Sequence, residues 1–441
     1  MAPAIDNPRL IGLEILLEWE KSHRKLNEIL QNALVRFSYL PRQDRAFIKN
    51  LTEGTVERLL TLDHVLDSYS KVPSRKMKPL VRGVLRLSVY QLLFLSHVPP
   101  SAVCNEAVKM IRRKGAGGLS GFVNGVLRSI VRNMPDLSAI EDLSIKYSTP
   151  EWIVDRFCQE YGRDAAEKIL QSFVGARPIF IRANQTRIGT DALCDILKDE
   201  GVEVRKELAF VAFSLPDMDY ALEIRIKGGL EELKSFREGL FSVQDLSSMA
   251  VVALAAPNPG DRVLDICAAP GGKACHAAEL LKGSGSVIAR DVSYQKVALI
   301  QENRDRLGLS NLSAEVADAR VFEPEAEEKA DLVIADLPCS GLGVMGRKND
   351  LKYRVRPEDI NSLSDLQRQI LENAVRYVKP GGRLVFSVCT LTREETREQS
   401  AFLKGFPTLT MLEDRLILPE NNGPDGFYIA VFRKAVKGDE A

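Results

Sequence analysis

The segment RVLDICAAPGGK, residues 262–273, is the part of the sequence that most clearly indicates the fold class. A short apolar run ends in an acidic residue, and small residues with two glycines then lead into a helical pattern. Glycines at such a turn let backbone amides approach a ligand, and the start of the following helix favours anionic groups. A strand, turn and helix in this order are typical of a doubly wound α/β sheet, which binds ligands beyond the carboxyl ends of its strands.

The pattern continues on the carboxyl-terminal side, where short apolar strands alternate with helices. The expected strands are 262–269, 286–292, 311–318, 331–337 and 382–390, and the expected long helix is 362–378. These strands show little polar alternation, as is typical of strands buried on both faces of a parallel sheet. The sequence therefore predicts a Rossmann-like α/β domain over residues 241–441.

The first third of the chain is predicted to be an all-α domain over residues 1–140. Apolar residues recur at three- and four-residue spacing, and prolines and glycines separate the segments. The expected helices are 10–19, 51–69, 79–95, 101–113 and 121–133. Residues 141–240 are expected to form a small α+β domain, with helices at 151–162 and 190–201 and strands at 177–184, 207–215 and 220–226.

The charge is unevenly distributed along the chain. The 441 residues contain 60 Lys+Arg and 60 Asp+Glu, which gives a net charge of zero. Residues 1–140, however, contain 21 Lys+Arg and only 12 Asp+Glu. This excess indicates a polyanion-binding module joined to an acidic remainder, although chance surface composition explains it equally well.

Several protein classes are excluded by composition. The seven cysteines include no CxxC pair and there are four histidines, which argues against a disulfide framework and against a metal site. The first residues lack the pattern of a secretion signal, and no apolar run approaches the roughly 20 residues of a membrane span. We expect a cytoplasmic monomer without a membrane segment.

Two acidic residues extend the ligand site predicted at the turn. Asp291 lies 19 residues after Gly272, at the end of the next strand, where a carboxylate can accept both hydroxyls of a ribose. Asp318 ends the third strand and can accept from an adenine amino group. A nicotinamide cofactor would require a GxGxxG turn for its pyrophosphate, which APGGK lacks. An acidic cradle without a phosphate site favours S-adenosylmethionine as the ligand. The alternative is that this is an ordinary tight turn and that the acids at the strand ends bind no ligand.

Two cysteines follow later strands of the same sheet. Cys339 lies in DLPCSG (336–341) and Cys389 in SVCT (387–390). A single cysteine at a strand end is commonly a small buried apolar residue. A pair at the ligand-binding edge indicates a nucleophilic thiolate.

These motifs resemble those of a known family. DICAAPGGK, DLPCSG and SVCT, in this order and spacing, closely resemble the RNA (cytosine-5)-methyltransferases, and the helical segment 79–133 is similar to the NusB-type RNA-binding module. The combination resembles the Sun/Fmu family of 16S ribosomal RNA (cytosine-C5)-methyltransferases B over almost the whole chain. The resemblance implies an enzyme that uses S-adenosyl-L-methionine to methylate C5 of a cytosine in small-subunit ribosomal RNA.

The resemblance also implies roles for individual residues. Cys389 is expected to add to C6 of the cytosine, Cys339 to assist release of the product, and Asp336 to hold the N3/N4 edge of the base. The cofactor site is expected to comprise Cys267, Ala268, Ala269, Pro270, Gly271, Gly272 and Lys273, with Asp291, Asp318 and Asp336 as further acids on the cofactor or substrate side.

One segment after the Cys339 motif is rich in basic residues, and two alternatives to the predicted function stay open. The segment GRKNDLKYRVRP (346–357) is predicted to be an exposed loop that contacts the RNA backbone, or else simply a solvated basic loop. Transfer RNA is an alternative substrate. A non-catalytic RNA-binding assembly factor is an alternative function, which the presence of both cysteines and the cofactor turn disfavours.

Overall fold

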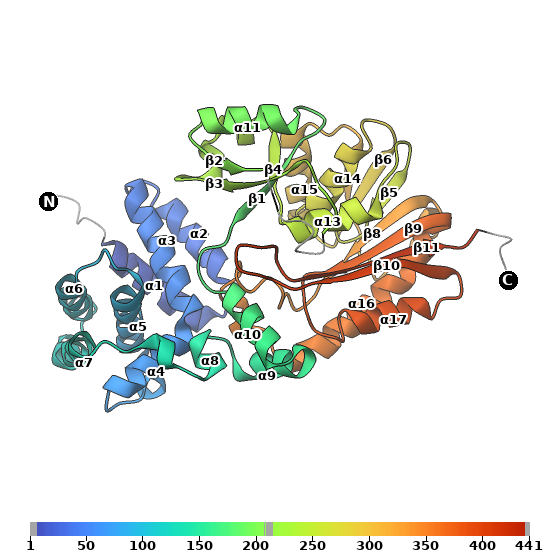
Figure 1. Ribbon diagram of the computed structural model, residues 1–441. Helices are drawn as coiled ribbons and strands as arrows, with labels where there is room; N and C mark the ends of the chain where they lie inside the picture. Colours follow the sequence, from blue (N-terminus) through green and yellow to red (C-terminus); the bar gives the residue numbers. More distant parts are fainter. Residues whose placement is uncertain (1–6, 207, 209–214, 437–441) are drawn as a thin grey trace. The chain divides into compact units, whose positions relative to one another are not determined.

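The structure is a computed structural model, which describes residues 7–206, 208 and 215–436. Contacts divide the chain into two compact units. The first comprises Met1–Val174 together with Met345–Val355, and the second comprises Gly175–Val344 together with Arg356–Ala441. Figure 1 shows the elements of both units.

The first unit is built from helices alone among its described residues, as the sequence predicts. They are α1 Pro8–Ser22, α2 Leu26–Arg36, α3 Arg42–Glu57, α4 Leu59–Tyr69, η1 Ser74–Lys76, α5 Pro79–Phe94, α6 Pro100–Arg113, η2 Gly117–Leu119, α7 Ser120–Arg132, η3 Leu137–Ala139, α8 Leu143–Lys146, α9 Glu151–Tyr161 and α10 Arg163–Ser172, with η6 Leu351–Tyr353 from the later segment.

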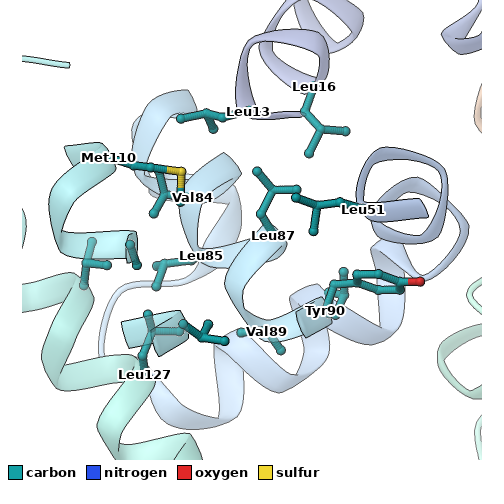
Figure 2. Packing of buried hydrophobic residues seen from close by; sticks show 14 of the residues in the cluster. Leu13, Leu16, Leu51, Val84, Leu85, Leu87, Val89, Tyr90, Met110 and Leu127 are labelled. Atoms are coloured by element: carbon teal, nitrogen blue, oxygen red, sulfur yellow. The ribbon is translucent and has the colours of Figure 1, made fainter. Parts of the chain in front are cut away.

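Helix α5 is the core of this unit and packs against α1, α3, α4, α6 and α7. Figure 2 shows Leu51 and Leu87 pointing toward one another and Met110 directed toward Val84. All four side chains are buried, and burying a leucine or methionine of this kind contributes about 1.5–3 kcal/mol.

Two details of the first unit differ from the prediction. The helix expected over 51–69 is two helices, because the backbone leaves helical geometry at Arg58, whose amide bonds to the Gly54 carbonyl. Helix α2 was not predicted, because it is short and only three of its eleven residues are buried.

The segment 345–355 is part of the helical unit instead of an open loop. Asp350 accepts a hydrogen bond from the Leu26 amide at 3.0 Å. The Lys352 ammonium donates to the Glu57 carbonyl at 2.9 Å, and the Tyr353 ring packs edge-on against Trp19 with ring centroids 6.4 Å apart.

This packing shows that the predicted loop over 346–357 is not exposed throughout, while its contact with RNA stays a prediction. Lys352 is only 5% exposed, and burial lowers the pKa of its ammonium to about 7. The central part of the segment is therefore unavailable to RNA. Arg347, Lys348, Arg354 and Arg356 remain exposed.

The second unit begins with a small antiparallel sheet of order β2-β3-β1-β4. Its elements are β1 Ile179–Ala183, α11 Thr190–Asp199, β2 Glu203–Arg205, β3 Ala221–Arg225, η4 Leu230–Glu232, α12 Lys234–Arg237 and β4 Phe241–Val243. The strands expected at 177–184 and 220–226 are confirmed. Most of the strand expected at 207–215 lies outside the described residues. The short strands β2 and β4 were not predicted.

The second sheet has seven strands in the order β10-β11-β9-β8-β5-β6-β7. Its elements are α13 Leu246–Ala255, β5 Arg262–Asp265, α14 Gly272–Leu280, β6 Ser286–Asp291, α15 Tyr294–Leu307, β7 Leu312–Val316, η5 Pro324–Ala326, β8 Ala330–Asp336, α16 Pro357–Tyr377, β9 Val378–Val388, α17 Arg397–Lys404, β10 Leu409–Ile417 and β11 Phe427–Lys434. The five predicted strands, β5 to β9, are parallel to one another, which confirms the Rossmann-like arrangement.

The two last strands make the sheet mixed. Strand β11 runs antiparallel to β9, and β10 runs antiparallel to β11. This carboxyl-terminal hairpin was not predicted. Among the described helices, none is long and apolar enough to cross a bilayer.

Candidate active site

The candidate active site lies where β5, β8 and β9 end, side by side in the large sheet. Strands β8 and β9 are parallel, and Asp336 at the end of β8 is paired in register with Ser387. Cys339 follows Asp336 by three residues and Cys389 follows Ser387 by two. The topology therefore brings two distant cysteine motifs to the same edge of the sheet.

The two thiols are in direct contact. The Sγ atoms of Cys339 and Cys389 lie 3.3 Å apart, and both residues are half-buried. The hydrogen bond with Cys389, together with burial, raises the pKa of the Cys339 thiol well above its ordinary value. Cys339 therefore keeps its proton and can donate it in a hydrogen bond to the Cys389 sulfur.

Asp336 is fixed on both of its carboxylate oxygens. Lys273 Nζ lies 2.6 Å from Oδ2, and Ser387 Oγ donates to Oδ1 at 2.8 Å. The Lys273 ammonium also lies over the Phe427 ring, 5.1 Å from its centroid. A residue of the cofactor turn is thus joined to a residue of the first cysteine motif.

The turn after β5 has the tight geometry that the sequence predicts. Gly271 has φ = 104°, and a Cβ atom there would approach the Ile300 backbone to 3.3 Å. The Ala268 amide donates to the Arg290 carbonyl at 2.8 Å, which ties the turn to β6. Asn303 donates to the Pro270 carbonyl at 3.0 Å from α15. Glycine is therefore required at 271, and the turn is held by its neighbours.

The predicted acids of the next two strands differ in their surroundings. Asp291 is buried and accepts hydrogen bonds from the Ala269 amide at 3.0 Å and the Val292 amide at 2.8 Å. Asp318 instead pairs with Arg320 at 2.6 Å, and these hydrogen bonds lower the pKa of its carboxyl. Asp291 therefore contacts the turn directly, whereas Asp318 contacts Arg320.

Cys267 lies at the start of the predicted cofactor loop, and its thiol is largely enclosed. Burial raises the pKa of Cys267, so that this thiol remains neutral. Within the described residues no group of three or more His, Cys, Asp and Glu side chains is arranged to hold a metal ion.

Asp265, at the end of β5, tests whether this site fits a cationic nucleoside. Both of its carboxylate oxygens are buried and make no hydrogen bond of regular geometry, although the Cys267 backbone amide is close enough to lower the pKa of the carboxyl in part. Burial, and then the nearby Asp336 carboxylate, raise the pKa of Asp265 to about 8, although Lys273 offsets part of this effect. A buried polar group without a partner requires an explanation. The ammonium group of S-adenosylmethionine is a donor of the kind that such a carboxylate lacks, so the residues fit this cofactor.

Some functional residues were missed by sequence reasoning. Asp265 stood inside the quoted motif but was not assigned a role. Ser387 and Lys296, which lies 2.9 Å from Asp291, carry no signal in the sequence that could have identified them. Arg182, from the small sheet, is buried and donates to the Gly272 carbonyl at 3.2 Å while it pairs with Glu279.

Three family profiles match the chain. The profile described as 16S rRNA methyltransferase RsmB/F matches residues 251–433, the NusB family profile matches 6–132, and a Methyltr_RsmF/B-like ferredoxin-like domain profile matches 149–215. The helical, small and Rossmann-like parts of the chain therefore each have a matching profile.

Relatives match over nearly the full length. A protein from Bacillus subtilis (strain 168) named probable ribosomal RNA small subunit methyltransferase B is 39% identical over 97% of this chain and 98% of its own. A protein of the same name from Synechocystis sp. is 32% identical over 97% and 99%.

Solved structures share the fold. The crystal structure of PH0851 superimposes with a TM-score of 0.79 at 26% identity, covering 98% of this chain and all of that one. NSun6 from Pyrococcus horikoshii with SFG has a TM-score of 0.57 at 22% identity and covers 65% of this chain and 98% of that one. The chain belongs to the ribosomal RNA small subunit methyltransferase B family, whose members are S-adenosylmethionine-dependent enzymes.

Proposed function

We propose that this enzyme methylates C5 of a cytosine in 16S ribosomal RNA through a transient bond between Cys389 and C6 of the base. The observation that carries the proposal is the 3.3 Å contact between the Cys339 and Cys389 sulfurs. This contact lies beside the paired Lys273 and Asp336 side chains. Family membership supports ribosomal RNA as the substrate class.

The chemistry explains why a thiolate is needed. C5 of cytosine is a poor nucleophile, and addition of the Cys389 thiolate to C6 makes C6 tetrahedral and turns C5 into the nucleophilic carbon of an enamine that includes C4. Such covalent catalysis divides one difficult step into easier ones. S-adenosylmethionine, when bound, supplies an electrophilic methyl group to C5. The base must leave its stack to reach the site, at a cost of a few kcal/mol.

The remaining residues prepare and complete this addition. Cys339 donates its proton toward the Cys389 sulfur and so favours the thiolate there. Asp336, held by Lys273 and Ser387, is placed to accept from the exocyclic amine of the cytosine and to offset charge on the ring. After methyl transfer a base removes the C5 proton, and the electron pair of the C–H bond expels the Cys389 sulfur. We assign Cys339 to this release.

The cofactor cradle is proposed to be the turn from Cys267 to Lys273 with three acids around it. Asp265 is proposed to receive the ammonium group and Asp291 the ribose hydroxyls. Asp318 is proposed to receive the adenine amino group, for which its Arg320 partner must yield. The helical residues 1–140 are proposed to bind RNA, and residues 241–441 are proposed to catalyse methyl transfer. Residues 141–240 are proposed to connect these two domains.

The test uses labelled S-adenosylmethionine and unmodified small-subunit RNA, followed by mapping of the label. We expect the label on C5 of one cytosine and no transfer by the Cys389→Ala variant. The matched control is Cys158→Ala, which removes another half-buried thiol from α9. Transfer by Cys389→Ala would contradict the assignment of the nucleophile, and preferential labelling of transfer RNA would contradict the substrate.

A further inference from the structure

Glu395 is a buried carboxylate close to both cysteine motifs. It follows Cys389 by six residues and precedes α17, and its relative exposure is 0%. Burying an ionised carboxylate is costly unless hydrogen bonds compensate for the lost water. The hydrogen-bond donors around Glu395 therefore indicate its structural role.

Glu395 binds the residue that follows Cys339. The Ser340 amide donates to Oε1 at 2.8 Å, and the Ser340 hydroxyl donates to Oε2 at 2.5 Å. The carboxylate thus holds both the main chain and the side chain of one residue. Hydrogen bonds to an ionised acceptor are about twice as strong as those between neutral groups.

The same carboxylate binds the residues that follow Cys389. The Thr392 hydroxyl donates to Oε2 at 2.8 Å, and the Thr390 hydroxyl lies 3.3 Å from this oxygen. Thr390 Oγ1 also lies 2.7 Å from Ser340 Oγ. With the Ser340 hydrogen directed to Glu395, the Thr390 hydroxyl donates to Ser340 Oγ, so the residues that follow the two cysteines are linked to each other and, through Ser340, to Glu395.

Gln367 on α16 fixes the other side of the Cys339 loop. Its Nε2 donates to the Pro338 carbonyl at 2.9 Å and lies 3.3 Å from Glu395 Oε1. The Cys339 loop is thus held before and after the cysteine. A further backbone bond joins the loops directly, from the Gly343 amide to the Cys389 carbonyl at 3.1 Å.

We infer that Glu395 is a positioning residue that clasps the Ser340 and Thr390 loops together and so sets the contact between the Cys339 and Cys389 sulfurs. The inference rests on the proposed function for its consequence in catalysis. Its structural part, the sulfur contact, is independent of that function. Glu395 does not touch the reacting atoms, and it acts through the backbone on either side of the two thiols.

An amide at this position cannot replace the carboxylate. In the Glu395→Gln variant one of the two oxygens becomes an NH2 group, which faces donors on either side. If the NH2 group takes the position of Oε1, the Ser340 amide loses its acceptor; if it takes the position of Oε2, the Ser340 and Thr392 hydroxyls must rotate to accept from it. In either case the hydrogen bonds to a charged acceptor are lost or become weaker neutral ones, and the two loops are held less tightly. A displacement of about 1 Å between reacting groups can reduce a rate by about 100-fold.

The first measurement needs no RNA. Diamide removes two hydrogens and two electrons from a thiol pair, and mass spectrometry of the peptides that contain Cys339 and Cys389 follows the disulfide formed. We expect this disulfide to form at least about tenfold more slowly in Glu395→Gln than in the wild type. The matched control is Glu398→Gln, which removes a partly exposed carboxylate from α17 and should oxidise at the wild-type rate.

The second measurement separates positioning from folding and binding. We expect Glu395→Gln to lower kcat by about 100-fold with changes below about threefold in the KM for RNA and in the Kd for S-adenosylmethionine. The Glu395→Asp variant keeps an acceptor and should recover part of both the kcat and the disulfide rate. If Glu395→Gln does not fold, the Ser340→Ala variant replaces it, because this variant removes only the hydrogen bond from the Ser340 hydroxyl. It should lower kcat less than Glu395→Gln does, again with little change in the KM for RNA and in the Kd for S-adenosylmethionine.

The outcomes distinguish the two proposals. A wild-type disulfide rate in Glu395→Gln, or equal loss in kcat and in cofactor binding, would overturn the role of Glu395. A slowed disulfide rate in Glu395→Gln would support the clasp even if the Cys389→Ala variant still transferred methyl groups, in which case only the proposed function would fail.

Discussion

The ammonium group of Lys273 lies 2.6 Å from the carboxylate of Asp336, and this pair joins the cofactor turn to the loop that carries Cys339. The Lys273 side chain is 9% exposed, so water screens the pair little. Asp265 lies close enough for Lys273 to lower the pKa of its carboxyl. One ammonium thus balances two neighbouring carboxylates at the centre of the site.

Loss of this ammonium should therefore impair the site. In the Lys273→Met variant the Asp336 carboxylate loses its cationic partner, and we expect kcat/KM to fall by about 100-fold, which is about 3 kcal/mol. Steady-state methyl transfer measures this loss. Lys168→Met, an exposed substitution on α10, is the control and should retain full activity. Equal activity of the two variants would contradict a role for the Lys273–Asp336 pair.

The raised pKa of Asp265 should make the free energy of unfolding depend on pH. Its carboxyl has a pKa of about 8 in the folded chain but about 4 in the unfolded chain. Between these values the folded chain holds more protons than the unfolded chain, so the contribution of Asp265 to stability falls as pH rises. The Asp265→Asn variant cannot titrate, and its free energy of unfolding relative to the wild type should increase from pH 4 to pH 8 by up to about 5 kcal/mol.

Chemical denaturation without cofactor at pH 5 and pH 8 measures this difference. The exposed Asp195→Asn substitution on α11 is the control and should show no trend. Because Asp265 is proposed to receive the ammonium group, Asp265→Asn should also bind S-adenosylmethionine at least about tenfold more weakly, as expected when a charged hydrogen bond is lost. A flat difference in stability between the two pH values would refute the neutral, buried state of Asp265.

Cys339 is proposed to assist release of the methylated product. In the Cys339→Ala variant the bond between Cys389 and RNA should therefore persist, and a denaturing gel should show a protein band shifted by the attached RNA. The double variant Cys339→Ala, Cys389→Ala should show no shifted band. Multiple turnovers by Cys339→Ala at the wild-type rate would exclude the release role.

The packing of segment 345–355 against the helical unit should contribute to the free energy of unfolding. The Tyr353 ring packs against Trp19, and its hydroxyl donates to the Ser148 carbonyl at 2.9 Å. Tyr353→Ala should lower the free energy of unfolding by about 1–3 kcal/mol, because it removes a partly buried aromatic ring and its hydrogen bond. Tyr39→Ala, at a position 67% exposed in the same unit, should change it by less than about 0.5 kcal/mol. Similar effects of the two variants would contradict the docking of the segment.

The sequence was sufficient for the parts of the fold that have a regular pattern. The alternation of apolar strands and helices predicted β5 to β9, because strands buried on both faces are nearly continuous apolar runs. The motif order also predicted that Cys339 and Cys389 would share one edge of the sheet. These predictions depend only on short-range pattern and on the rule that parallel strands end together.

The parts that failed depend on contacts between distant residues. The segment 346–357 is rich in arginine and lysine and was expected to be exposed, but its partners on α1 to α4 lie about 300 residues earlier in the chain. Glu395 lies in the charged run TREETRE and carries no mark of burial. Two of its donors, Ser340 in a loop and Gln367 on α16, lie 55 and 28 residues away in the chain, so only the folded chain identifies it.

The most direct test of the account is to identify the atom that bonds to RNA. In RNA containing 5-fluorocytosine the fluorine replaces the C5 hydrogen that a base must remove, so that the methylated adduct cannot break down. After incubation with S-adenosylmethionine, nuclease and protease digestion, mass spectrometry should find a methylated fluorocytidine attached to Cys389. An adduct on Cys339, or methyl transfer to ordinary RNA with no adduct on either cysteine, would contradict the account.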